Sequence, residues 1–136
     1  MREYLSDHRG IVVAAVLVLV LVVAAVAAKV LAERSAESQT QDRAEQVRSL
    51  LRGATPDDFL AFNAGVKTPG SIAQRVRDQP DFVNVRATAD LSFIRFEPDG
   101  WWSGFTERCV VAEVTPRGVH VRVPKTACVR VQVPNG

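Results

Sequence analysis

The stretch IVVAAVLVLVLVVAAVAA, residues 11–28, decides the fold, because it runs for eighteen residues without one polar side chain. An amphipathic helix of a globular protein would carry a polar face over this length. Lys29 interrupts the run, and VLA at 30–32 adds one further apolar turn. About 20 apolar residues, at ~1.5 Å of rise each, cross the ~30 Å hydrocarbon core of a bilayer. Residues 11–32 are therefore predicted to form a transmembrane helix, with the Lys29 ammonium reaching the interface.

A cleaved signal peptide is the competing interpretation of this segment. Arg2 and Arg9 supply a positively charged start, and AVA at 25–27 supplies the small residues of a cleavage site. The apolar part of a signal peptide spans only about 7–15 residues, however, so an uncleaved signal-anchor is favoured. Basic residues flank the run about equally on both sides, so the positive-inside rule does not decide the orientation of the helix in the membrane. We expect residues 1–10 to be a short cytoplasmic tail, and a lone cysteine pair beyond the membrane suits an oxidising compartment.

One long helix is predicted to continue past the membrane, because neither Gly nor Pro occurs between residue 11 and Gly53. Small and apolar side chains recur at helical spacing along one face of this segment. Residues 33–53 are therefore predicted to form a juxtamembrane helix. Its far end packs on the domain that follows and its near end acts as a stalk. The predicted stripe consists of Ala36, Thr40, Ala44, Val47 and Leu51.

Residues 54–136 are predicted to form a small extracytoplasmic α+β domain. Thr55 and Pro56 begin a short helix that reaches Asn63, and Ser71 begins a second one that Pro80 ends. Alternating apolar and polar residues then predict β-strands. The fold class is α+β: an N-terminal transmembrane helix extending into a juxtamembrane stalk helix, two short helices, and an antiparallel sheet of four or five strands. The predicted strands are 82–89, 91–97, 105–114, 118–124 and 127–133.

Cys109 and Cys128 are the only cysteines. A metal site needs about four ligands, or three where it is catalytic, and two thiols with two distant histidines do not supply them. A C-x-x-C redox motif is also missing. A disulfide between Cys109 and Cys128 is therefore predicted, with two free buried thiols as the alternative. A plain meander would place the pair two strand spacings, ~10 Å, apart, whereas a disulfide needs Cα atoms within about 7 Å. Either a bend at residues 124–127 brings Cys128 over the end of the strand at 118–124, or the thiols are free.

Two groups of side chains are candidates for contacts with other molecules. Trp101, Trp102 and Phe105 surround a turn at 98–100 and form either a partner-binding surface or ordinary core. Adjacent strand residues point to opposite faces, so at most one tryptophan is expected to fill a core. The second group is basic and forms either a contact for anionic headgroups or cell-wall polymers, or a solvated strand face. Its members are Arg117, Arg122, Lys125 and Arg130.

The layout of a membrane helix, a stalk and a small antiparallel sheet with a C-terminal cysteine pair resembles type IV pilin-like subunits. It is similar also to small membrane-anchored subunits of bacterial secretion machinery. The chain departs from the pilin pattern, because no Gly-Phe-type processing site precedes the apolar run and no glutamate lies early in it. The resemblance therefore implies an architecture and no activity.

We expect a non-catalytic, single-pass protein of a bacterial envelope that binds or scaffolds another membrane or envelope protein, or itself, besides the bilayer. No enzyme motif is present, and no cofactor or metal is expected. The net charge of +2 gives no indication of nucleic-acid binding. A ligand-binding or sensing accessory subunit of a secretion or pilus-like machine is the alternative function, and an envelope enzyme is the third.

Overall fold

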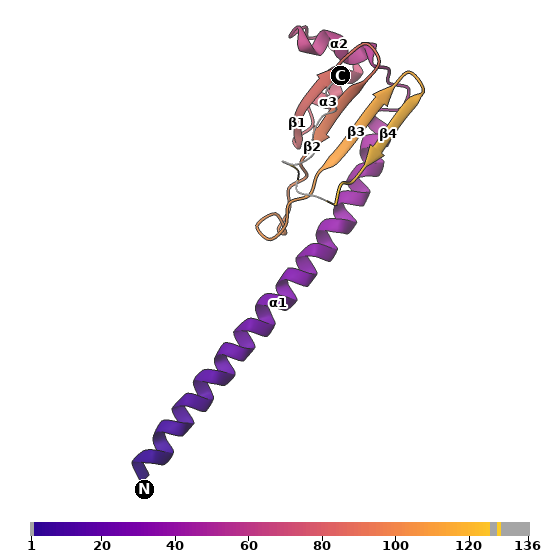
Figure 1. The fold of residues 1–136 in the computed structure, drawn as a ribbon. Helices are drawn as coiled ribbons and strands as arrows, with labels where there is room; N and C mark the ends of the chain where they lie inside the picture. Colours follow the sequence, from indigo (N-terminus) through magenta and orange to yellow (C-terminus); the bar gives the residue numbers. More distant parts are fainter. Residues whose placement is uncertain (1, 126–127, 129–136) are drawn as a thin grey trace.

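The computed structural model describes residues 2–125 and 128, with side chains from residue 8 onward. Three helices come first and four strands follow, which confirms the predicted α+β class (Figure 1). The predicted strand at 127–133 lies outside the described residues, apart from Cys128. The elements are α1 (Arg2–Leu50), α2 (Asp57–Asn63), α3 (Ile72–Arg77), β1 (Phe82–Ala87), β2 (Ser92–Phe96), β3 (Val110–Thr115) and β4 (Gly118–Arg122).

Helix α1 has two parts with different surroundings. Every residue from 8 to 27 is exposed, and the most apolar 18-residue window of α1 has a mean hydropathy of 3.4. This part is long and apolar enough to cross a membrane, and none of that window is buried within the molecule. The second part carries the predicted stripe, all of which is buried. Figure 1 shows both parts as one rod, with the sheet at the C-terminal end.

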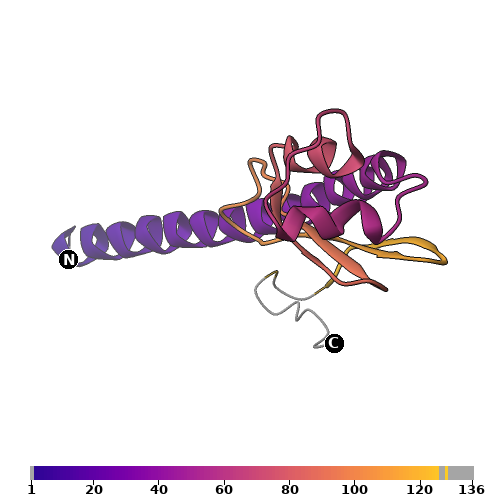
Figure 2. The same ribbon diagram turned by 90° about the horizontal axis from the view of Figure 1, so that it is seen from above.

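The second part of α1 and the sheet share one hydrophobic core. Val47 of α1 and Leu51, the residue directly after that helix, are fully buried there beside Phe59 of α2 and Val76 of α3. All three helices cover the same face of the sheet, so the domain has two layers (Figure 2). The sheet contributes alternate residues, as the period of two requires. These include Ile94, Phe96, Val110, Ala112, Val114 and Val121.

The ends of the helices follow the sequence signals closely. Helix α1 ends at Leu50, and Gly53 has a φ of 77°, a left-handed conformation that favours glycine after a helix. Ser71 caps α3, because its hydroxyl oxygen accepts a hydrogen bond of 3.1 Å from the backbone N–H of Gln74. At the start of α2 the Asp58 carboxylate accepts a hydrogen bond of 2.7 Å from the backbone N–H of Thr55.

The strands form an antiparallel meander in the order β1-β2-β3-β4. Four of the five predicted strands are present, with ends within a few residues of the prediction except at one place. The strand predicted from residue 105 begins only at Val110. The residues between Phe96 and Val110 form a loop instead, which extends along α1 toward its apolar part (Figures 1 and 2).

Candidate functional site

The loop at residues 97–109, here called the aromatic loop, is built from tight turns. The backbone N–H of Ser103 donates to the carbonyl of Gly100 at 3.0 Å. The Trp102 carbonyl accepts from Phe105 at 2.9 Å and from Thr106 at 3.1 Å. These local hydrogen bonds use the backbone groups that a strand would pair with its neighbour. This is why the strand predicted to start at Phe105 starts later.

Trp102 attaches the aromatic loop to α1. Its side chain is 1% exposed and clusters with Ala32 and Ala36 of the helix. The indole N–H donates a hydrogen bond of 2.9 Å to the Gln39 side-chain oxygen. A Cβ on Gly100 would lie 2.6 Å from the indole nitrogen, so the loop needs glycine there. The near end of the juxtamembrane helix is therefore covered by the aromatic loop and is not the bare stalk that the sequence led us to expect.

Trp101 and Phe105 of the aromatic loop are exposed, unlike Trp102. Their side chains are 58% and 53% exposed, and their rings meet edge to face with centroids 6.4 Å apart. One tryptophan of the pair is thus buried and the other exposed, as the sequence suggests. The reason differs, since both lie in a turn and not on a strand. The exposed pair remains a candidate for contact with a partner.

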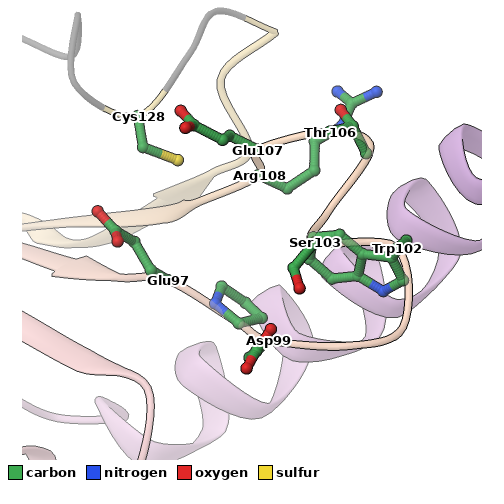
Figure 3. A pocket seen from close by; sticks show the side chains of 9 residues that line it. Glu97, Asp99, Trp102, Ser103, Thr106, Glu107, Arg108 and Cys128 are labelled. Atoms are coloured by element: carbon green, nitrogen blue, oxygen red, sulfur yellow. The ribbon is translucent and has the colours of Figure 1, made fainter.

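A cavity of about 340 Å³ lies between the aromatic loop and Cys128 (Figure 3). Three carboxylates and one guanidinium line it, and the Arg108 Nε is buried without a hydrogen-bond partner. A buried donor without a partner is costly, so this N–H is an unused hydrogen-bond donor of a lining residue. The charged lining residues are Glu97, Asp99, Glu107 and Arg108.

Cys109 and Cys128 lie together on the sheet face opposite α1. The structure gives both as buried thiols that are in hydrogen-bonding contact, in a small cluster with Phe93 and Val111. The Cys128 carbonyl accepts a hydrogen bond of 3.4 Å from Arg95 of β2. The four described strands form a meander, and the fifth predicted strand lies outside the described residues apart from Cys128, so the disulfide and its alternative of two free thiols both stay predictions. Cys128 packs with Phe93 of β2 and Val111 of β3.

Burial raises the pKa of the Cys109 thiol, and contact with Cys128 lowers it by less. Burial also raises the pKa of Cys128, and its hydrogen bond to Cys109 raises it further. A thiol with a raised pKa is a poor nucleophile at neutral pH, because the thiolate is the reactive form. This environment fits a structural role for the pair better than a catalytic one.

The raised pKa values predict that the reduced protein loses stability in alkali. Above about pH 8.5 the thiols ionise in the unfolded chain while the folded thiols stay protonated, so the unfolded state binds fewer protons. The free energy of unfolding should fall by up to about 1.4 kcal/mol per pH unit for each thiol. Urea denaturation of detergent-solubilised protein between about pH 8 and pH 10 measures this slope.

Two controls accompany this measurement. The Cys109→Ala/Cys128→Ala variant should lack the slope, and oxidised protein should lack it too if the disulfide forms. An equal slope in reduced protein and in the double variant would show that other groups cause it.

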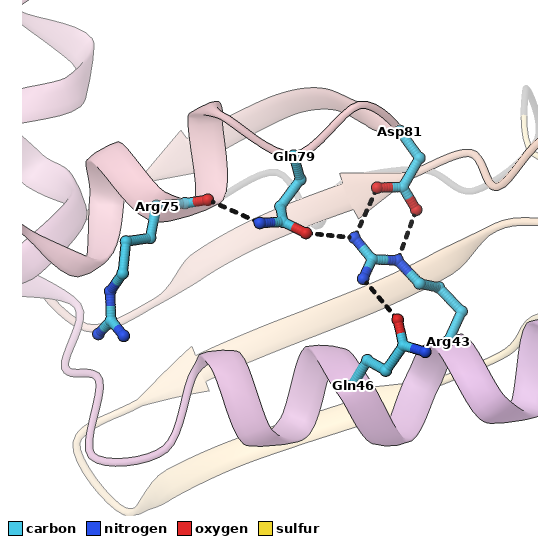
Figure 4. Close-up of polar contacts among 5 residues, drawn as sticks. All are labelled: Arg43, Gln46, Arg75, Gln79 and Asp81. Carbon is cyan, nitrogen blue, oxygen red and sulfur yellow. Dashed lines mark hydrogen bonds and ion pairs between the residues drawn. The ribbon is translucent and has the colours of Figure 1, made fainter.

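Arg43 of α1 forms the most extensive polar network of the described residues (Figure 4). Its guanidinium donates to both oxygens of Asp81, at 2.7 and 2.6 Å, and also to Gln79 at 2.9 Å and Gln46 at 3.0 Å. Both ion-pair partners are largely buried, with side chains 16% and 10% exposed. This network was not predicted from the sequence. A signal was present, since position 43 precedes Val47 by one helical turn and so lies on the buried face.

The four basic residues singled out from the sequence do not form one strip in the described part of the chain. Arg122 pairs with Glu113 at 3.0 Å, so its charge is met by an acid on the neighbouring strand. Arg117 lies in the β3–β4 turn, beside a hollow that is also lined by Arg48 and Arg52, while Lys125 follows the other end of β4. Arg130 lies outside the described residues. Their contact with an anionic partner stays a prediction.

Comparison with known proteins gives no relative for this chain: no protein-family model, no curated protein and no solved structure matches it significantly. Within residues 8–125 and Cys128, no group of three or more His, Cys, Asp or Glu side chains is placed to hold a metal ion. Function is therefore inferred from the geometry alone.

Proposed function

We propose that this chain is a single-pass membrane protein whose α+β domain binds or scaffolds another envelope protein, without catalysis. The continuity of α1 is the observation that carries the proposal. Its apolar part has no cover within the molecule, whereas its second part lies in the domain core. A bilayer would cover the first part and thereby hold the domain at a fixed distance from the membrane. We place the N-terminus in the cytoplasm and the domain outside, with the helix uncleaved as a signal-anchor.

Two observations support a binding role over an enzymatic one. The two thiols are buried and carry raised pKa values, so they are unsuited to nucleophilic chemistry. The exposed aromatic pair, in contrast, is suited to contact with another molecule and carries no group for chemistry. Chemical crosslinking of native membranes, followed by purification of the full-length chain, tests this role. Recovery of the chain as an uncrosslinked monomer alone would contradict it.

Topology can be measured with a cysteine placed at Lys67, an exposed position between α2 and α3. The native cysteines are only 0% and 4% exposed, so they should resist a membrane-impermeant maleimide in the folded chain. We expect the Lys67→Cys variant to be labelled in intact cells and the wild-type chain to stay unlabelled. Labelling of the variant only after lysis would place the domain in the cytoplasm. Retention of the full-length chain after alkaline carbonate extraction tests the anchor itself.

A ligand-binding accessory subunit of a secretion or pilus-like machine is the second candidate, favoured by the cavity behind the aromatic loop. Its three lining carboxylates, Glu97, Asp99 and Glu107, outnumber the one guanidinium of Arg108 and would suit a small cationic ligand such as an amine. Thermal denaturation in the presence of small amines should show stabilisation that the Glu107→Gln variant loses. Equal stabilisation of both proteins would place the binding elsewhere.

A further inference from the structure

The aromatic loop meets α1 where the apolar run of the helix ends. Residues 8–27 are exposed, and Ala28, the last residue of the uninterrupted apolar run, is the first to be half-buried. Ala32 and Ala36 follow on the same face and are buried by Trp102. Ala28 and Ala32 are four residues apart, which is ~6 Å along a helix. The contact therefore fixes the aromatic loop at the level where a helix spanning the bilayer would leave the hydrocarbon.

Trp101 and Phe105 are the largest apolar side chains that the domain exposes, and both belong to this loop. They are held together by their edge-to-face contact and by the turns around Trp102. Aromatic side chains of this kind, above all Trp, are enriched at the boundary between hydrocarbon and headgroups. Outside α1 and this loop, the exposed large hydrophobic side chains of the described chain are Leu60, Val66 and Val83.

The charges around the loop are compatible with a membrane surface. Lys29 is exposed on α1, one residue past the apolar run, where its ammonium can reach the headgroups. The acidic side chains of the loop, Glu97, Asp99 and Glu107, line the cavity, and neither Trp101 nor Phe105 does (Figure 3). The carboxylates of the loop thus line a cavity that the aromatic pair does not line.

We propose that the aromatic loop is a second membrane attachment, which inserts Trp101 and Phe105 into the headgroup boundary of the bilayer. The proposal rests on the proposed function to the extent that α1 must span the membrane. The bilayer is favoured over a protein partner because the loop is attached to α1 at Ala32 and Ala36, directly after the apolar run, where the headgroups would lie. The contact of Trp102 with Ala32 and Ala36 of α1 holds Trp101 and Phe105 at this level along the helix.

Fluorescence quenching by brominated lipids tests this contact. The full-length chain is reconstituted into phosphatidylcholine vesicles with plain or chain-brominated lipids, and wild type is compared with Trp101→Phe. The substitution keeps an aromatic ring against Phe105 and leaves Trp102 as the only tryptophan. We expect brominated lipid to remove a large share of the wild-type emission and to have a much smaller effect on Trp101→Phe. Iodide in the aqueous phase should quench the emission of Trp101 only weakly, because the bilayer would shield this side chain.

A matched control uses Trp101→Phe/Val66→Trp, which moves the reporter to the exposed position after α2, at the end of the domain far from the apolar part of α1 (Figure 1). This tryptophan should be quenched by iodide and not by brominated lipid. The inference is overturned if Trp101 behaves like the control, or if brominated lipid affects wild type and Trp101→Phe equally. Shielding of Trp101 from both quenchers would indicate self-association and would also overturn it. Alkaline carbonate extraction separates these results from failure of the anchor, in which case the protein leaves the vesicles altogether.

Discussion

Trp102→Ala is expected to release the aromatic loop from α1 while the sheet stays folded. Truncation of a buried aromatic side chain costs about 3–5 kcal/mol. Trp102 lies in a small cluster with Ala32 and Ala36, separate from the main core, so the loss should affect local opening of the loop more than global unfolding. A cost of about 3 kcal/mol corresponds to an opening population roughly 100 times larger, since each 1.36 kcal/mol is tenfold.

Hydrogen exchange of the detergent-solubilised full-length chain measures this opening. The backbone amides of Ser103, Phe105 and Thr106 make the turn hydrogen bonds and should lose protection. Trp101→Ala provides the matched control, because its exposed side chain should change the stability by less than about 0.5 kcal/mol. Unchanged protection of the loop in Trp102→Ala would show that the turns alone hold it in place.

Arg43→Met is expected to lower the free energy of unfolding of the whole domain by about 3 kcal/mol, the lower end of the cost of breaking a buried ion pair. The substitution keeps the apolar stem and removes the guanidinium, so the Asp81 carboxylate, 10% exposed, stays buried without its partner. Gln79 loses the same donor, which loosens the segment that leads into β1. Urea-dependent proteolysis of the solubilised chain measures the loss.

A double-mutant cycle separates this ion pair from other effects. Adding Asp81→Asn to Arg43→Met should recover part of the stability, since no buried charge is left unpaired. Arg43→Lys should restore only part of the stability that Arg43→Met loses. A lysine keeps the charge but cannot donate to both carboxylate oxygens in the fork geometry of arginine. Additive losses in the double variant would contradict a direct pairing of the two side chains.

The features that the sequence predicted well are local ones. The apolar run, the stripe ending at Leu51 and the cap at Ser71 depend on neighbours within about four residues, where helical periodicity determines which side chains meet. The core strands were found for the same reason, since Val110, Ala112 and Val114 alternate with residues of the other face. In each case the sequence pattern predicts both the type of element and which of its faces is buried.

The contacts that the sequence did not predict join distant segments. Trp102 bonds to Gln39, 63 positions away, and Arg43 pairs with Asp81, 38 positions away. Periodicity does not determine which loop returns to which turn of a helix. The contact of Cys128 with Cys109 also joins distant segments. The spacing of neighbouring strands did not predict it, because that spacing applies to residues within a sheet and Cys128 packs against a face of the sheet.

The unbroken course of α1 fixes the direction in which the sheet lies around the helix axis, relative to the apolar part of the helix. Residues 11–50 of this 49-residue helix, which is ~74 Å long, contain neither Gly nor Pro and so have no sequence site for a sharp kink. Each residue turns the helix by ~100°. One residue added to the apolar run would therefore rotate the whole sheet by that angle about the helix axis, relative to the N-terminal end of α1. The number of residues in the apolar run thus sets the angle between that end of the helix and the face of the sheet.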